Sequence, residues 1–159
     1  LASQLQPQWQ LSKFEGLSML RSGALLHELG LLIEYKNHHH HGAYIISHTE
    51  MPGFTRAQQQ LLMALVYNHR ADINRDIIAR QTMTSVLLAV RLTRLLRLSV
   101  LLSMRRRYEA LPEVQISAQA EVLTLVLPKG WLEQHPLMRA ELEQEVLYQQ
   151  QAGWQLQLR

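Results

Sequence analysis

The alternation of apolar and polar positions indicates helices in the first two thirds of the chain. Apolar residues recur at steps of three and four between residues 9 and 30, and again between residues 58 and 69, which predicts a helix over each segment. Gly30 stands where a glycine in the left-handed conformation commonly ends a helix. Thr55, followed three positions later by Gln58, predicts a capping box that opens the second helix.

The longest predicted helix covers residues 84–107. Its Val and Leu residues surround the helix on all sides as far as residue 102, so we expect it in a core or in an interface, and we expect no strand between residues 84 and 102. Shorter features separate the main helices. They are a polar histidine run, a short helix and a further short helix, over residues 37–42, 43–48 and 72–80.

The pattern changes after Glu109. Two alternating strands, a turn, a helix and a closing strand follow in that order, at residues 114–118, 122–127, 128–130, from 136 onward, and at 154–158. The sequence therefore predicts a mainly α fold, with a helical domain over residues 1–110 and a small α+β domain over residues 111–159.

Composition and charge narrow the function classes. The chain has 159 residues, 47% of them hydrophobic, and no apolar run approaches the roughly 20 residues that cross a bilayer. There is no cysteine, which excludes disulfides and thiolate zinc sites and fits a cytoplasmic protein. The net charge is +3, and 13 of the 16 basic residues are arginines, which favours a polyanionic partner. The first residue, Leu1, suggests a fragment of a longer protein.

Three histidine-containing segments carry the most informative chemistry. His27, Glu28 and His69, with the run at residues 38–41 between them, resemble the HD phosphohydrolase fold, in which a helix ending in His-Asp supplies metal ligands. Glu28 replaces the Asp of that motif, and Ser99 stands where a late Asp is expected. The resemblance therefore implies a degenerate HD-like helical domain without a working metal site.

A second resemblance covers nearly the whole chain. Several motifs follow in the order found in the exopolyphosphatase and guanosine pentaphosphate phosphohydrolase family, and they lie at His27 to Gly30, His39 to Tyr44, Met51 to Phe54, Asn68 to Arg70, Leu95 to Leu98, and Gly153 to Trp154. The chain is similar to the C-terminal region of that family.

This family resemblance implies a division of labour. Two N-terminal actin-like domains outside the chain would hold the magnesium and the catalytic carboxylate, so no catalytic residue, metal ligand or cofactor is assigned to the chain itself. We expect a cytoplasmic homodimer in which this chain binds polyphosphate or guanosine pentaphosphate. The predicted phosphate-binding residues are His39, His41, Arg94, Arg97 and Arg105.

Other interpretations stay open at this point. The chain could be a stand-alone, metal-dependent HD-type phosphohydrolase, a purely structural dimerisation domain or a nucleic-acid-binding module, although no interleaved aromatic platform supports the last. The arginines around residue 94 could form local ion pairs in place of ligand contacts, and His27 could be an ordinary hydrogen-bonded core residue.

Overall fold

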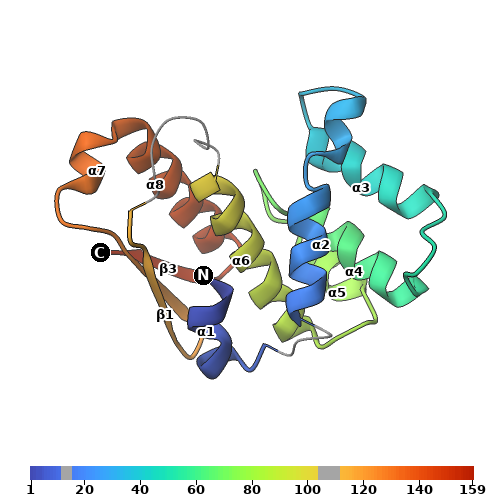
Figure 1. Cartoon of the computed structure of the whole chain (residues 1–159), viewed down its shortest axis with the longest axis horizontal. Helices are drawn as coiled ribbons and strands as arrows, with labels where there is room; N and C mark the ends of the chain where they lie inside the picture. The colour runs from blue at the N-terminus through green and yellow to red at the C-terminus, as the bar shows by residue number, and fades with distance from the viewer. Residues whose placement is uncertain (12–15, 104–111) are drawn as a thin grey trace. The chain divides into compact units, whose positions relative to one another are not determined.

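The computed structural model describes residues 1–11, 16–103 and 112–159, and these form two compact units (Figure 1). Unit 1 contains both ends of the chain, Leu1–Gln10 and Ser99–Arg159, and unit 2 is the continuous segment Leu11–Leu98. Unit 2 is therefore an insertion in unit 1 along the sequence. The fold is mainly helical with one small sheet, as the apolar pattern predicts.

Unit 2 consists of helices and their connections. Its elements are α2 (Ser18–Leu26), the 3₁₀ helix η2 (Leu29–Leu32), α3 (His38–His48), α4 (Arg56–Tyr67), α5 (Arg75–Arg80) and most of α6 (Val86–Ser103). Helix α4 packs against both α2 and α3, and buries Leu61, Leu62 and Leu65 completely. A close approach joins α2 to α6, because a Cβ atom at Gly23 would lie 3.1 Å from the Leu96 side chain.

Several of the predicted helices are confirmed. The capping box is present, with Thr55 Oγ1 accepting from the Gln58 amide at 3.2 Å and the Thr55 amide donating to Gln58 Oε1 at 2.8 Å. Helix α6 is the longest, and residues 92–98 are buried without interruption. Among the described residues, no helix is both long enough and apolar enough to cross a membrane.

Two predictions about the first half need correction. Residues 9–30 do not form one helix, because α1 (Ala2–Trp9) ends at the left-handed Gln10 and α2 ends at Leu26, before Gly30. The short helix predicted over residues 43–48 begins five residues earlier and includes the histidine run. Asn37 is left-handed, with φ at 57°, and turns the chain so that α3 starts at His38. The histidines therefore occupy the first turn of a helix.

The prediction for Gly30 is also wrong, since this glycine is not a left-handed helix end. It lies within η2, and the glycines with positive φ are Gly53, Gly130 and Gly153. A Cβ atom at Gly30 would lie 1.7 Å from the His38 carbonyl oxygen and 2.6 Å from the Gly42 nitrogen. Glycine is required because the backbone of η2 touches the backbone of α3.

Unit 1 is built around a three-stranded sheet with the order β1 (Gln115–Gln119), β2 (Val122–Val126), β3 (Gln155–Leu158). Strands β1 and β2 are antiparallel, whereas β2 and β3 are parallel. The parallel pair needs a crossover, which α7 (Trp131–Gln134) and α8 (Pro136–Gln151) provide. Leu123 and Leu125 are fully buried, which confirms the predicted alternation of faces.

Helix α1 belongs to the sheet unit, which the sequence did not predict. Gln4 Nε2 donates to the Val114 carbonyl at 3.0 Å, and Gln4 Oε1 accepts from the Ile116 amide at 2.7 Å, so one side chain satisfies the edge of β1. Trp9 Nε1 donates to the Ala120 carbonyl at 3.3 Å. The domain boundary between residues 110 and 111 lies outside the described residues and stays a prediction.

Replacing Gly30 with Ala should destabilise unit 2 by several kcal/mol, about the cost of strong overpacking or more, because the added carbon would collide with backbone atoms that cannot rotate away. Gly53 is the matched control. It has φ at 90°, and a Cβ atom added there would have no neighbour within 4 Å, so Gly53→Ala should cost only about 1 kcal/mol of left-handed backbone strain. Urea denaturation of both variants measures the difference, and equal losses would contradict the close backbone approach at Gly30.

Candidate functional site

Four histidine rings of unit 2 meet in what we call the histidine cluster. His27 follows the end of α2, His38 and His39 begin α3, and His69 follows the end of α4. His69 lies at its centre. Its ring centroid is 5.3 Å from that of His27, 5.4 Å from that of His38 and 6.1 Å from that of His39. His38, His39 and His69 are all buried. The sequence named His27 and His69 as one site, and the structure brings them together.

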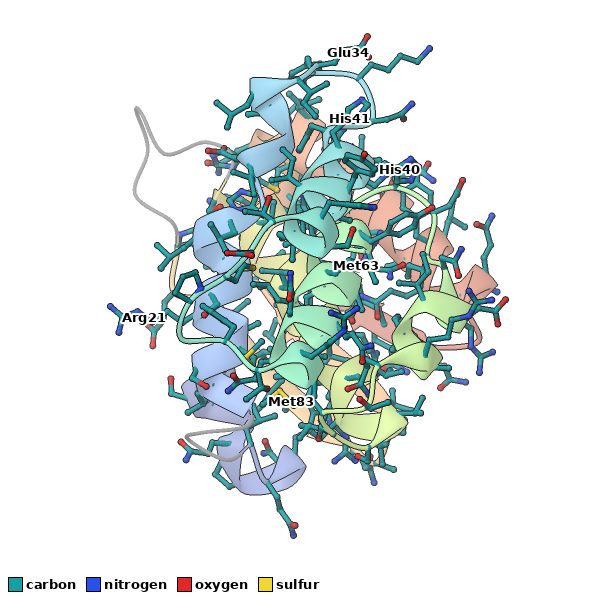
Figure 2. All side chains as sticks on the ribbon, turned by 90° about the vertical axis from the view of Figure 1, so that its right-hand side faces the viewer. Arg21, Glu34, His40, His41, Met63 and Met83 are labelled. Carbon is teal, nitrogen blue, oxygen red and sulfur yellow. The ribbon has the colours of Figure 1, made fainter. Side chains whose placement is uncertain are left out.

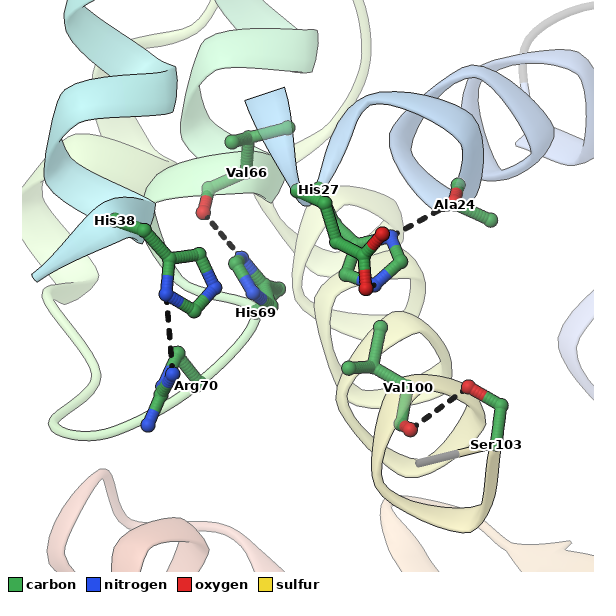
Figure 3. Close-up of polar contacts among 9 residues, drawn as sticks. Ala24, His27, His38, Val66, His69, Arg70, Val100 and Ser103 are labelled. Carbon is green, nitrogen blue, oxygen red and sulfur yellow. Dashed lines mark hydrogen bonds and ion pairs between the residues drawn. The ribbon is translucent and has the colours of Figure 1, made fainter. Parts of the chain in front are cut away.

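Backbone carbonyls hold two of these rings in defined tautomers (Figure 3). The Nδ1 atom of His27 lies 2.8 Å from the Ala24 carbonyl, and that of His69 lies 2.7 Å from the Val66 carbonyl. Because a carbonyl can only accept, each Nδ1 carries the hydrogen and donates it. In the neutral rings the lone pair is therefore on Nε2, which is left as an acceptor.

His38 differs because two partners compete for one nitrogen. Its Nδ1 lies 3.1 Å from the Tyr35 carbonyl and 3.1 Å from Nη1 of Arg70. A protonated Nδ1 donates to Tyr35, whereas an unprotonated Nδ1 accepts from Arg70, so one bond excludes the other. The tautomer of His38 therefore decides whether Arg70 is held at the start of α3.

Burial keeps three rings of the cluster, those of His38, His39 and His69, uncharged at neutral pH. Desolvation lowers the pKa of His69 to about 3, and the neighbouring histidines lower it further against the opposing effect of the Val66 carbonyl. Desolvation likewise lowers the pKa of His39 to about 4, helped by the nearby His40 and Arg70. The pKa of His38 is also lowered, mainly by burial. At neutral pH these three rings do not attract an anion by charge.

The predicted role of His39 in phosphate binding thus meets a physical obstacle. Its side chain is only 4% exposed, and its Nδ1 atom has no hydrogen-bond partner among the described residues. A phosphate oxygen could reach this atom only if α3 or its neighbours moved. Phosphate binding by His39 stays a prediction, and the present arrangement does not favour it.

The cluster resembles a metal site only in part. Donation of Nδ1–H to a carbonyl is how metal-binding histidines are commonly oriented, and Glu28 Oε1 lies 3.8 Å from Nε2 of His27. Within residues 1–11, 16–103 and 112–159, however, no group of three or more His, Asp or Glu side chains is arranged to hold a metal ion. The relation to the HD fold stays a prediction.

The two predicted arginines of α6 are inside the protein. Arg94 is 0% exposed and Arg97 is 2% exposed. The guanidinium of Arg97 donates to the Asn68 carbonyl at 2.7 Å and to the Ala71 carbonyl at 2.8 Å, so it secures the chain that leaves α4. Neither side chain can reach a ligand in this arrangement. The third predicted arginine, Arg105, lies outside the described residues.

The other predicted phosphate ligand, His41, is half-buried beside a carboxylate. Its Nε2 lies 3.7 Å from Glu34 Oε2, and Figure 2 shows the two side chains near each other at one end of α3. The ring of the adjacent His40 stacks on that of Tyr67, with centroids 4.4 Å apart. The sequence did not single out His40, Tyr67 or Arg70 as neighbours, because the helical start of α3 was not predicted.

Acid should weaken unit 2 through these histidines. The folded pKa values of His38, His39 and His69 lie below the ordinary value of 6.5, so below that pH the unfolded chain binds protons that the folded chain does not. The stabilisation that comes from keeping these histidines neutral should be complete above pH 6.5. The free energy of unfolding should then decrease as the pH is lowered toward 5. The loss should approach about 1.4 kcal/mol per pH unit for each such histidine.

Urea titrations between pH 7.5 and 5 measure this slope, and His69→Gln should make it shallower. A slope that is the same in both proteins would show that His69 is not buried in its neutral form.

Arg97→Lys should lower the free energy of unfolding by about 2–4 kcal/mol, because one ammonium cannot reproduce the forked contact with two carbonyls and leaves one of them unpaired. Arg139→Lys is the control. Arg139 forms an exposed pair with Glu143 at 2.8 Å, and such pairs contribute about 1 kcal/mol or less. Thermal and urea unfolding give the comparison, and similar small losses would argue against a structural role for Arg97.

Comparison with known proteins gives consistent results. The sequence model described as Ppx/GppA phosphatase, domain III, matches residues 1–146. A guanosine-5'-triphosphate,3'-diphosphate pyrophosphatase of Aeromonas salmonicida is 47% identical, one of Aeromonas hydrophila is 46% identical, and one of Pseudoalteromonas translucida is 43% identical. Each match covers 98% of this chain, but only 31–32% of the relative.

The chain thus spans about a third of the length of the curated relatives it matches. These matches confirm the resemblance to the family that the ordered motifs indicated. The family match covers 146 of the 159 residues. The chain belongs to the Ppx/GppA phosphatase family and corresponds to domain III of its members.

Proposed function

We propose that this chain binds the phosphate chain of polyphosphate or of guanosine pentaphosphate, and that hydrolysis takes place in a preceding, magnesium-dependent part of the same protein. The name of the relatives, which describes a pyrophosphatase acting on a guanosine derivative with five phosphates, supports a ligand of this class. In this proposal the chain contributes affinity and orientation for a polyanion and supplies none of the reacting groups.

The observation that carries the proposal is the uneven distribution of charge. Unit 2 has ten Lys and Arg residues against six Asp and Glu residues, a net charge of +4, whereas unit 1 has six against seven, a net charge of −1. A polyanion is attracted by the summed field of such a unit, including its buried arginines. Binding is therefore expected on unit 2.

Within unit 2, the start of α3 offers the most suitable surface. Lys36 and Arg70 are exposed there, and Arg70 reaches the His38 ring. The first turn of α3 contains no acidic residue, and Asn37 caps no amide with its side chain, so the positive end of the helix dipole is not offset. Arginine gives forked contacts to phosphate oxygens. We name this the α3 entrance, formed by Lys36, Asn37 and Arg70.

We propose the α3 entrance as the phosphate-binding site instead of Arg94 and Arg97, which the sequence suggested but which are buried. A phosphate that competes for Arg70 would release it from His38, which can then donate Nδ1–H to the Tyr35 carbonyl, since both partners lie at 3.1 Å. Without ligand, Arg70 donates to His38. With ligand, Arg70 binds the phosphate and His38 donates to the Tyr35 carbonyl, so both side chains have a partner in either state.

We also propose that the protein is a cytoplasmic homodimer. The apolar character of α6, which motivated the prediction of a dimer, is explained at residues 92–98 by burial within the described chain itself. The alternative, a stand-alone metal-dependent HD-type phosphohydrolase, needs a metal that activates water, and among the described residues no group of three or more His, Asp or Glu side chains is arranged to hold one.

Charge reversal at the α3 entrance should weaken polyanion binding. For the double variant Lys36→Glu and Arg70→Glu, we expect at least about tenfold lower affinity for polyphosphate, and a salt dependence shallower by about one unit for each phosphate that is no longer neutralised. Fluorescence titrations with labelled polyphosphate at two salt concentrations, with guanosine pentaphosphate as competitor, measure both quantities.

The matched control is the double variant Lys129→Glu and Arg139→Glu, which reverses two exposed basic residues of unit 1. It changes the net charge by the same amount but should leave the salt slope unchanged. Both variants should melt within a few degrees of the parent protein, because the replaced side chains are exposed. Equal affinity losses in the two variants would mean that binding follows net charge alone and that the α3 entrance is not the site.

A further inference from the structure

Unit 2 exposes a run of large apolar side chains between α2 and α3. Every residue from Leu31 to Asn37 is exposed. Within this run Leu32 is 80% exposed, Ile33 55% and Tyr35 75%. Figure 1 shows the segment beyond the end of α2 and beside α3. We call Leu31, Leu32, Ile33 and Tyr35 the apolar ridge.

The ridge is held in place by the fold and is not a loose loop. The backbone of η2 contacts α3 at Gly30, and the amides of Ile33 and Glu34 both donate to the Gly30 carbonyl, at 3.0 and 3.2 Å. The stability of unit 2 does not explain why a fixed segment presents consecutive apolar side chains to water. Contiguous exposed apolar patches of a few hundred Å² are often functional, as contact surfaces for another protein surface, a membrane or a ligand.

The size of the ridge helps to identify what covers it. Its four side chains offer on the order of 500 Å² of surface, which is less than the roughly 800 Å² per partner of a stable interface between separate chains. The same area is sufficient between parts of one chain, where the covalent link raises the effective concentration to the millimolar range. About two thirds of the length of the curated relatives lies outside the segment matched here.

We propose that the apolar ridge is the docking surface for the part of the same protein that precedes this chain. Exposed carboxylates accompany the ridge, because Glu28 precedes it and Glu34 stands between Ile33 and Tyr35, with side chains that are 71% and 62% exposed. Polar groups at the rim give register, and the apolar centre gives the contact energy. The preceding part should therefore present an apolar surface bordered by basic groups.

Docking at the ridge has a consequence for the proposed binding site. The ridge joins His27 to His38 along the chain, and Lys36 of the α3 entrance follows Tyr35 directly. A surface that covers the ridge therefore stands next to the α3 entrance. The docking proposal rests on the preceding catalytic part of the proposed function, but it does not require that this chain binds phosphate.

The test places a photo-crosslinking residue, p-benzoylphenylalanine, at position 32 of the full-length protein, without any phosphate ligand. The control places it at Leu147, which is 49% exposed on α8 of unit 1. Equal amounts of unlabelled and ¹⁵N-labelled protein are mixed before irradiation, and crosslinked peptides are identified by mass spectrometry. Once the two forms have exchanged subunits, a contact between two copies gives mixed and unmixed pairs in similar amounts, whereas a contact within one copy gives unmixed pairs alone.

The expected result is a crosslink from position 32 to a peptide of the preceding part, in isotopically unmixed pairs, and its loss when Ile33 and Tyr35 are both replaced by Ser. Mixed pairs would assign the ridge to a second copy and overturn the proposal. A yield at position 32 no higher than at position 147 would show that the ridge faces solvent and would overturn it as well. Neither outcome depends on the polyphosphate titration, so the two proposals fail separately.

Discussion

The arrangement of unit 2 depends on a backbone contact that leaves no room for a side chain. Where η2 meets α3, the Cβ position of Gly30 coincides with atoms of His38 and Gly42. This contact sets the distance between the end of α2 and the start of α3, and thus between His27 and His38. Because packed interiors resist shifts of even one methyl group, the histidine cluster, the α3 entrance and the apolar ridge all take their positions from it.

Buried histidines and buried arginines respond differently to the loss of hydration. Three histidines of the cluster, His38, His39 and His69, give up their charge, because desolvation is the largest effect on each of their pKa values. The arginines cannot do so, and Arg97 instead satisfies its guanidinium with the carbonyls of Asn68 and Ala71. Positive charge that can meet a ligand is therefore left to exposed side chains such as Lys36 and Arg70. The sequence alone does not show which basic residues are buried and which are exposed, because this depends on which face of each helix packs into the core.

The sequence predicted well what depends on local pattern. The capping box at Thr55, the long helix around residues 86–103 and the alternation of Leu123 and Leu125 all have local causes, and all are confirmed. What failed depends on contacts distant in sequence. A histidine run has no helical periodicity of its own, and its helical start follows from the left-handed Asn37 and from packing on η2. The pairing of Gln4 with β1 likewise has no local signal beyond the apolar pair Leu5 and Trp9.

That pairing determines the order in which the chain can fold. The bonds of Gln4 and Trp9 span 110 and 111 residues, whereas the contacts of unit 2 lie within one continuous segment. During synthesis, unit 2 emerges complete before β1 exists, so it can fold first as a unit. Helix α1 must wait for its partner strand, and closing so long a loop is slow. Until then, the apolar side of α1 is exposed to water next to a domain that has already formed.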